Sequence, residues 1–596
     1  MTKTKIAGFD RSQVLAPLVI GITGHRDIRN EDRRGLEDKV KKIFLKFHRD
    51  YNATPLILVT ALAEGADRLA AEVALSLHFK VHLVVPVPMP IELYELDFDS
   101  FTLLETPLGT VAVNRSSREE FHALLDRAET RFELELADGN TYETIADPGP
   151  ERDRQYELVG KFIARQSQIL IALWDGVDSN RVGGTASVVH FQTEGVPGPE
   201  PFAFEAPEGF PVYHILTPRL KNPYPQGEIQ NLHQIYPKVF QGNDAQAKKY
   251  YSEMFARLDE FNGYITRADR NRAKTIVKSK SYLLQDMPED ELPAGMESAL
   301  NRYAVADALA IGFQQRWILA QVGLHALTLS AFVCFLLSVH PSGQRHSFFV
   351  LSGLLLSGVL VIRKLFGDWS GDTKHEDYRA IAEGLRVKFF WELAGITDSI
   401  ADHYLGKQRS ELDWIRNGFR GWNVMEGRED HGTVDSMEDD NHRKRLGFAR
   451  KYWIDDQRRY FARAAESNLK YHEMFHVLGR NCIYGVFALG IVLALLCVWK
   501  HETHFDLVAI ILEVLLATAA ILHHFNNRMA YGEHAKQYNR MASLFARASD
   551  LLGKFLEHDD YENAYDCVRK VGNEALTENG DWVLLHRERP LEVPHP

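Results

Sequence analysis

Four apolar runs decide the fold of this chain, and they come as two close-spaced pairs. Residues 317–338 read WILAQVGLHALTLSAFVCFLLS, and residues 348–362 read FFVLSGLLLSGVLVI. In the second pair, residues 482–499 read CIYGVFALGIVLALLCVW and residues 507–522 read LVAIILEVLLATAAIL. A helix needs ~17–25 apolar residues to cross the hydrocarbon core of a bilayer. We therefore predict four transmembrane helices in two hairpins. The spans are expected at about 317–339, 347–365, 481–499 and 506–523.

The two pairs look like copies of one unit. Arg302-Tyr303 precedes the first pair, and Arg459-Tyr460 precedes the second pair 157 residues later. Tyr378 follows the first pair and Tyr538 follows the second, each with an alanine four residues on, at an offset of 160 residues. Landmarks in one order at a nearly constant offset are typical of a duplicated module.

Basic residues indicate the orientation of the spans. The two short turns hold only Arg345 and Lys500, whereas the long polar segments carry most of the flanking charge. Those flanking residues are Arg302, Arg316, Arg363, Lys364, Lys374, Lys470, Arg480, Arg528 and Lys536. The positive-inside rule then predicts a multi-pass protein of the cell (inner) membrane, with both termini and the middle segment in the cytoplasm.

Three polar side chains interrupt the spans. Glu513 lies about seven residues into the fourth run, where a buried carboxylate is costly and indicates a role or a partner. Gln321 and His325 lie four residues apart on one helical face, so they would line a polar interior together with Glu513. The alternative is that Glu513 is protonated and hydrogen-bonded for helix packing.

Composition argues against several classes of protein. A formal net charge of −12 gives no support to nucleic-acid binding. The four cysteines, three of them in or beside spans, have neither zinc-site spacing nor a disulfide pattern, so we predict no metal and a reducing setting. Met1 to Ala16 lacks an apolar signal segment, so membrane insertion would depend on the internal spans. No cofactor is predicted.

The segment from Pro17 to Arg219 alternates apolar runs of strand length with helical stretches. The predicted strands are Leu18–Thr23, Leu56–Thr60, Val81–Val87, Ile169–Trp174 and Val212–Leu216. The predicted helices are 32–51, 66–77 and 155–166, with a less regular section at 92–150 and a loop at 195–208. Runs that are apolar on both faces and alternate with helices predict an α/β fold with a Rossmann-like parallel sheet.

Ligands of an open parallel sheet bind beyond the carboxyl ends of its strands, and three such ends carry suggestive residues. The first end holds Gly21, Thr23, Gly24, His25 and Arg26; the second holds Glu64, Gly65, Asp67 and Arg68; the third holds Asp175, Gly183, Gly184 and Thr185. Glycines let the backbone approach a ligand, and the amides of a following helix attract phosphate. Glu64 would contact a ribose hydroxyl and Arg68 a phosphate. The alternatives are tight strand-to-helix turns, a surface ion pair of Arg68, and an N-cap at Thr185.

Together these ends resemble the SLOG superfamily, which includes the LOG-like cytokinin-releasing hydrolases, the DprA-like proteins and the N-terminal domain of TRPM channels. The resemblance implies a domain that binds a nucleotide-derived ligand. LOG-like enzymes carry a Pro-Gly-Gly-x-Gly-Thr motif followed by a catalytic Glu. Here the motif is shortened to Gly183-Gly184-Thr185 without that Glu, which argues against hydrolase activity.

The membrane half resembles the SLATT family of two-transmembrane effectors. That resemblance implies a membrane effector of prokaryotic defence or stress signalling, with pore formation as one mode of action, which a nucleotide-derived messenger controls through the SLOG-like domain. Four short spans give little wall for a pore, so we expect a homo-oligomer. The alternatives are a membrane-tethered nucleotide or nucleoside N-glycosidase that uses Glu64, and an anchor without ligand.

The predicted domain order follows from these runs. It is a SLOG-like domain at 17–220, a helical connector at 221–299, a two-transmembrane unit at 300–425, an acidic linker at 426–445, a second two-transmembrane unit at 446–575 and a C-terminal tail at 576–596. Within the tail, Trp582 to Leu585 is predicted to form a short strand.

Overall fold

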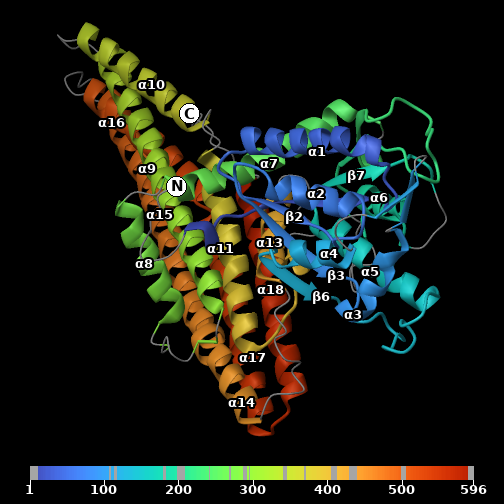
Figure 1. The fold of residues 1–596 in the computed structure, drawn as a ribbon. Helices are drawn as coiled ribbons and strands as arrows, with labels where there is room; N and C mark the ends of the chain where they lie inside the picture. The colour runs from blue at the N-terminus through green and yellow to red at the C-terminus, as the bar shows by residue number, and fades with distance from the viewer. Residues whose placement is uncertain are drawn as a thin grey trace. The chain divides into compact units, whose positions relative to one another are not determined.

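A computed structural model gives the fold of the chain (Figure 1). It describes residues 11–101, 103–106, 109–112, 117–178, 183–196, 208–240, 242–267, 270–285, 287, 292–293, 295–339, 345–367, 371–404, 412–427, 439–498 and 505–587. The chain forms two compact units. An α/β unit comprises Met1–Asp269 and Ser399–Thr433, and a helical unit comprises Arg270–Asp398 and Val434–Pro596.

The α/β unit is built on a sheet that has, in the described part of the chain, seven strands in the order β6-β3-β2-β1-β7-β8-β9. The strands are β1 Leu18–Gly24, β2 Leu56–Val59, β3 Val81–Val87, β6 Thr130–Glu133, β7 Ile169–Trp174, β8 Val212–Leu216 and β9 Leu232–Ile235. All neighbouring strands are parallel except β8 and β9. The parallel sheet is therefore confirmed, and its two edge strands, β6 and β9, were not predicted.

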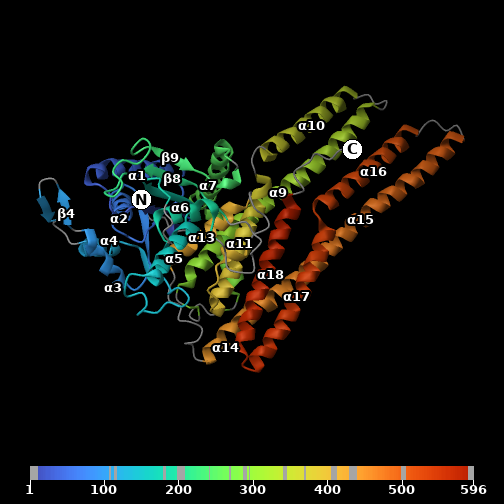
Figure 2. The same cartoon turned by 90° about the vertical axis from the view of Figure 1, so that its right-hand side faces the viewer.

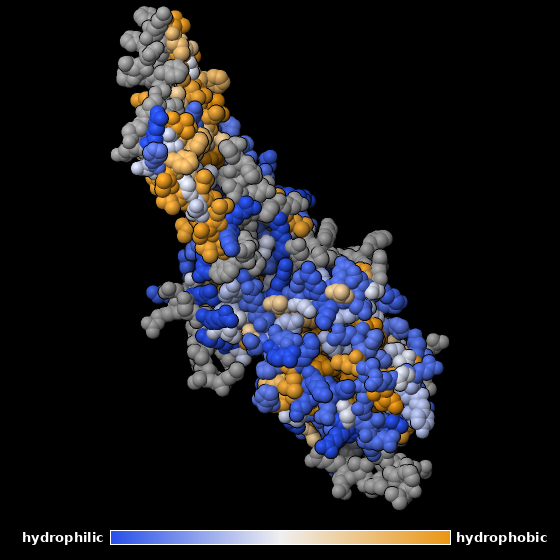
Figure 3. All heavy atoms as spheres, turned by 90° about the horizontal axis from the view of Figure 1, so that it is seen from above, coloured by the Kyte–Doolittle hydropathy of each residue, from blue (hydrophilic) through white to orange (hydrophobic). Residues whose placement is uncertain are grey.

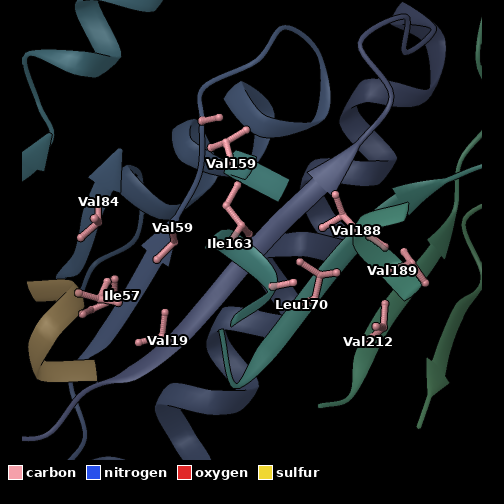
Figure 4. Close-up of a cluster of buried hydrophobic side chains, with 14 of the residues drawn as sticks. Val19, Ile57, Val59, Val84, Val159, Ile163, Leu170, Val188, Val189 and Val212 are labelled. Carbon is pink, nitrogen blue, oxygen red and sulfur yellow. The ribbon is translucent and has the colours of Figure 1, made fainter. Parts of the chain in front are cut away.

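Helices cover both faces of this sheet, because its central strands are apolar on both sides. On one face, Val159 and Ile163 of α5 (Pro150–Gln166) and Val188 of α6 (Thr185–Glu194) pack against β1, β2 and β7 (Figure 4). The other face carries α1 (Asn30–Asp50), α2 (Ala66–Leu75) and α7 (Asp244–Thr266). There, the ring of Phe47 contacts those of Tyr213 and Phe255.

The section at 92–150, predicted to be less regular, contains short elements. They are α3 Ile91–Tyr94, η2 Glu95–Phe101, the hairpin of β4 Leu103–Thr106 and β5 Gly109–Ala112, α4 Ser117–Leu125, and β6. This section therefore supplies one strand of the main sheet, β6, and also loops near the carboxyl edge of that sheet.

Two segments assigned to other domains by sequence belong to the α/β unit. Helix α7 lies in the predicted connector, yet the side chain of Asn262 pairs with the backbone N–H and carbonyl of Ala16. Helices α12 (Ile400–His403) and α13 (Asp413–Glu426) follow the first pair of spans, but α13 packs on the sheet. Trp422 donates from Nε1 to the carbonyl of Leu15 at 3.0 Å, and Val424 belongs to the sheet core. Of the predicted connector at 221–299, only the part from Arg270 onward, which includes α8 (Arg270–Leu284), belongs to the helical unit.

The helical unit repeats one arrangement of three helices (Figure 2). The first set is α9 Met296–Val339, α10 Arg345–Gly367 and α11 Gly371–Ala394, of 44, 23 and 24 residues. The second is α15 Asp455–Val498, α16 Phe505–Arg528 and α17 Tyr531–Glu557, of 44, 24 and 27 residues. In each set the long first helix packs against the other two. This agreement in order and length supports the predicted duplication.

Within the described residues, four helices are long and apolar enough to cross a membrane. They are α9, α10, α15 and α16, which contain the four predicted spans apart from residue 499, which lies outside the described residues. Large hydrophobic side chains such as Phe349, Leu354 and Phe487 are exposed along them, and Figure 3 shows part of this apolar surface in orange. The two turns at 340–344 and 499–504 lie outside the described residues.

The C-terminal prediction was wrong. Trp582 to Leu585 lie in a helix, α18 (Tyr561–Arg587), and not in a strand. Residues 576–587 are also no free tail, since Leu576 and Val583 are buried and the helix packs against α11 and α17. The physical reason is the spacing of these apolar residues, which follows the helical period over several turns, whereas four apolar residues alone do not distinguish helix from strand. Of the predicted acidic linker at 426–445, residues 428–438 lie outside the described residues, whereas 439–445 are helical and belong to α14 (Asp439–Phe448). The π-helical turn η6 (Ala449–Ile454) follows α14.

Candidate ligand-binding site

The carboxyl ends of β1, β2 and β7 meet at one edge of the sheet. The strand order reverses at β1, with β2 on one side and β7 on the other, so this edge is the topological switch point. The amide of His25 donates to the carbonyl of Leu173 at 3.1 Å, and the amide of Ala66 donates to the carbonyl of His25 at 3.1 Å. The turn after β1 is thus held between the other two, and the structure brings the three predicted turns together.

Four of the predicted glycines lie where chain atoms leave no room for a side chain. A Cβ atom at Gly24 would lie 2.4 Å from that of Ala66, and one at Gly21 would lie 2.3 Å from the Ser167 hydroxyl. At Gly65 and Gly183, φ is +78° and +74°, and a Cβ would also crowd the backbone. These glycines therefore allow close packing of the strand ends. A role for them in approaching a ligand stays a prediction.

His25 and Asp175 form a buried pair with Arg219, which we call the His25 clamp. Asp175 Oδ1 lies 3.0 Å from His25 Nε2, and Arg219 Nη1 lies 3.1 Å from His25 Nδ1. Because a guanidinium only donates, Nδ1 accepts from Arg219, while Nε2 faces both the Asp175 carboxylate and the Asp175 backbone N–H, which lies 3.0 Å away. Asn222 also donates to Asp175 at 3.1 Å.

The His25 clamp is better suited to holding strands than to proton transfer. Its three residues follow β1, β7 and β8, and both ring nitrogens are occupied. Burial lowers the pKa of His25, with Asp175 opposing the shift and Arg219 adding to it. The pKa of Asp175 is lowered although burial opposes this, since Asn222 and His25 stabilise the carboxylate. A neutral imidazole with no available lone pair has little to offer as a general base.

The second group, which we call the Glu64 cluster, consists of Glu64, Arg68 and Ser117. Ser117 donates from its hydroxyl to Glu64 Oε1, and Arg68 donates from Nη1 to the Ser117 carbonyl at 2.9 Å. Arg68 also donates from Nε to the carbonyl of Leu62 at 3.0 Å, and its guanidinium lies 4.6 Å from the ring centroid of Phe98. Arg68 is 1% exposed and pairs with Glu120 at 3.0 Å, so the ion pair considered from sequence is formed by a buried arginine and not by one at the surface.

Two polar atoms of this cluster have no hydrogen-bond partner among the described residues. Within the part of the chain that the structure describes, Glu64 Oε2 and Arg68 Nη2 are buried and make no hydrogen bond. Glu64 is 8% exposed, and burial raises its pKa against the opposing effects of Ser117 and the two arginines, Arg68 and Arg26. Buried polar atoms are nearly always hydrogen-bonded in folded proteins. The cluster therefore has one acceptor and one donor that a bound molecule would satisfy.

Arg26 lies beside the Glu64 cluster and adds positive charge. Its guanidinium carbon is 5.2 Å from the ring centroid of Tyr156. Although burial opposes it, the neighbouring Tyr94 and Tyr156 raise the pKa of Arg26, which keeps it charged. Tyr156 in turn donates to Asp97, which also pairs with the buried Arg152 at 3.0 Å. Tyr156 comes from α5, on which the turn containing Gly183 rests.

The remaining predicted residues fall into two groups. Asp67 is buried and accepts a hydrogen bond from Thr60 at 3.0 Å, and burial raises its pKa to about 6. Thr23 is a buried residue of β1. Gly184 precedes α6, which begins at Thr185, and a glycine has no side chain to cap the first amides of that helix. Thr185 is therefore the first helical residue and not the N-cap.

Sequence reasoning missed several residues of this edge. Ser117, Tyr94 and Asp97 come from the section that was predicted to be less regular, where no strand end marks them. Arg219 and Asn222 follow the correctly predicted β8, so the rule that residues after a parallel strand approach the site would have included them.

The polar residues of the spans do not all meet. Gln321 and His325 are both buried, and the ring of His325 contacts those of His524 and Phe525 on α16. Glu513 is half-buried and precedes His524 by 11 residues, which is ~16 Å along a helix. The single polar interior predicted for all three residues is therefore not formed.

No protein-family model matches the chain, and no curated protein matches it.

Proposed function

We propose that this chain is an integral membrane protein that binds a nucleotide-derived ligand through its α/β unit and responds as a membrane effector. The proposal retains the SLOG-like and SLATT-like reading of the sequence, with a role in prokaryotic defence or stress signalling. It also retains a homo-oligomer in the inner membrane with cytoplasmic termini. Support comes from the switch-point edge of the α/β unit and from the four apolar helices.

One observation carries the ligand proposal, namely the unsatisfied atoms of the Glu64 cluster. Glu64 Oε2 is an acceptor and Arg68 Nη2 is a donor, and both are buried at the end of β2. A hydroxyl group donates to the first and accepts from the second. Sugar hydroxyls have this dual character, so the cluster suits the ribose of a nucleotide, with Glu64 in the role predicted from sequence.

Charge at the same edge suits a phosphate. Arg26 is cationic and contacts the ring of Tyr156. The turn containing Gly183 rests on the same Tyr156, and this turn leads into the uncapped start of α6, where the first amides of the helix are free. A helix N-terminus attracts anions through its free amides and its dipole. Arg68, in contrast, uses its other donors within the protein, which favours the hydroxyl role over the phosphate contact predicted for it.

The chain connections between the two units would let binding of such a ligand affect the membrane helices. The polypeptide passes between the two units after Asp269, after Asp398 and after Thr433. Residues Ser399–Thr433, which return the chain to the α/β unit, are tied to α5, since Arg165 pairs with Asp402 at 2.9 Å. It is also tied to the residue after α5, since Gln168 donates to the carbonyl of Asn417. Helix α5 also bears Tyr156, so one rigid element links the candidate site to the segment that joins the helical unit after Asp398 and after Thr433.

The test uses the full chain purified in lipid nanodiscs and a panel of mono-, di- and cyclic nucleotides. We expect one member of the panel to raise the thermal stability of the α/β unit and Glu64→Gln to abolish that rise. The amide replaces the Oε2 acceptor with a donor while keeping the shape of the side chain. Glu72→Gln is the matched control, because Glu72 lies on α2, the helix that directly follows Glu64, and pairs at the surface with Arg33.

Each outcome distinguishes among the functions under consideration. Stabilisation without turnover supports the sensor. Release of free base in the same mixtures would establish the N-glycosidase, with Glu64→Gln inactive. No stabilisation by any nucleotide, together with equal behaviour of both variants, would refute the ligand proposal and leave the anchor.

A further inference from the structure

The two repeats of the helical unit contact each other through one pair of spans. Helix α9, the first span of the first repeat, packs against α16, the second span of the second repeat (Figure 2). The ring of His325 on α9 lies 5.2 Å from that of Phe525 and 5.4 Å from that of His524 on α16. On α9 this contact face is closed, since Gln321 and His325 are 1% and 6% exposed.

The duplication provides an equivalent for each side of this contact. With the offset of 157 residues, Gln321 and His325 on α9 correspond to Leu478 and Cys482 on α15. With the offset of 160 residues, Phe525 on α16 corresponds to Leu365 on α10. A contact between α15 and α10 would therefore repeat the contact between α9 and α16.

Both of these equivalent faces are open. Leu478 is 47% exposed and Leu365 is 63% exposed, in contrast to the closed face on α9. In the described part of the chain, α10 packs on α9 and α11, whereas α15 packs on α16, α17 and η6. One copy of the chain thus makes one of the two contacts that its duplication provides.

We propose that a second copy of this chain supplies the other contact, with α15 of one copy docked on α10 of the next. Exposure alone does not select this partner, because lipid tails are as apolar as leucine side chains. The repeat does, because the same pair of faces is already joined within each copy. The two faces differ, so the contact is head-to-tail, and copies joined in this way form a ring of alternating hairpins when the rotation between copies closes. This inference rests on the membrane insertion assumed in the proposed function and is independent of the ligand.

The test is thiol cross-linking of full chains in native membranes. Cys334, Cys497 and Cys567 are replaced by alanine throughout. One epitope-tagged chain keeps Cys482, and a second chain with a different tag carries Cys482→Ala and Leu365→Cys. The contact between His325 and Phe525 implies that Cys482 and the new cysteine lie within reach of a short bifunctional thiol reagent. We expect a cross-linked dimer that carries both tags.

A matched pair controls for random collisions in the bilayer. Leu360→Cys and Phe487→Cys, each with Cys482→Ala, move both cysteines five residues toward the hairpin turns. They stay at one depth but rotate by about 140° around each helix. Both native residues are exposed, at 63% and 68%.

The cross-linking result decides the proposal. A mixed dimer several-fold above the control pair supports the head-to-tail contact. Equal yields from both pairs would overturn it and leave lipid against these faces. Cross-linking only when one chain carries both cysteines, with no dimer, would also overturn it, because the chain would then close on itself. Nucleotide stabilisation of the same variants is measured separately, so failure here and failure of the ligand proposal are distinguishable.

Discussion

Asp67→Asn tests whether the buried carboxylate at the end of β2 is held with a raised pKa. Asp67 has a pKa of about 6 in the folded protein, compared with ~3.9 in an unfolded chain. As pH rises, the unfolded chain loses this proton first, so the folded state loses stability progressively from about pH 4 to pH 6. The shift of about two units corresponds to ~3 kcal/mol, since each unit is 1.36 kcal/mol. Asparagine keeps the hydrogen bond from Thr60 and does not titrate.

The assay is amide hydrogen exchange of β2 and α2 in the full chain, corrected for intrinsic exchange rates. The free energy of opening of the variant minus that of the wild type should rise with pH and level off above pH 6. About half of the ~3 kcal/mol should appear between pH 5 and pH 7.5. A difference that is flat with pH would refute the reasoning. It would mean that Asp67 is ionised throughout and stabilised by a cation such as Arg26.

Three further predictions address packing and topology. Gly24→Ala should destabilise the α/β unit by about 1–3 kcal/mol, because its Cβ would lie 2.4 Å from that of Ala66; Gly263→Ala, with open space around it, is the thermal-unfolding control. Gly421→Ala should speed proteolysis within α13, because its Cβ would lie 2.8 Å from the Pro17 carbonyl; unchanged cleavage relative to Gly447→Ala would contradict the docking of α13. A cysteine at Ser342 or Thr503 should react with an impermeant thiol reagent outside intact cells, whereas reaction at Thr373 or Ser436 would reverse the predicted orientation.

Local pattern was sufficient where an element is long or is buried on both faces. The bounds of three strands, β3, β7 and β8, agree with the predicted runs Val81–Val87, Ile169–Trp174 and Val212–Leu216. The reason is that an uninterrupted apolar run of this length between turns is typical of a buried strand. The edge strands β6 and β9 escaped prediction because they are short and only partly buried. Hydropathy located the apolar spans. It did not predict that the same helices continue beyond the spans as polar sequence for several turns.

The candidate site was predictable in position but not in detail. The rule for parallel sheets identified the ends of β1, β2 and β7, and the structure places them together. It could not indicate that Gly24 accommodates Ala66, or that His25 is enclosed by Asp175 and Arg219, since those partners lie far apart in sequence. The membership of α13 in the α/β unit was hidden for the same reason, because its anchor at Leu15 lies some four hundred residues earlier.

The position of α13 has a consequence for synthesis of the chain. Most of the α/β unit leaves the ribosome before the first hairpin, but α13 follows that hairpin. Until α13 is made, the sheet lacks Trp422 against Leu15 and Val424 in its core. The unit therefore completes its fold only after the ribosome has delivered α9 and α10. If these helices insert as they emerge, a binding-competent α/β unit arises only on chains already anchored in the bilayer, and a fragment that ends before Ser399 would be an incomplete domain.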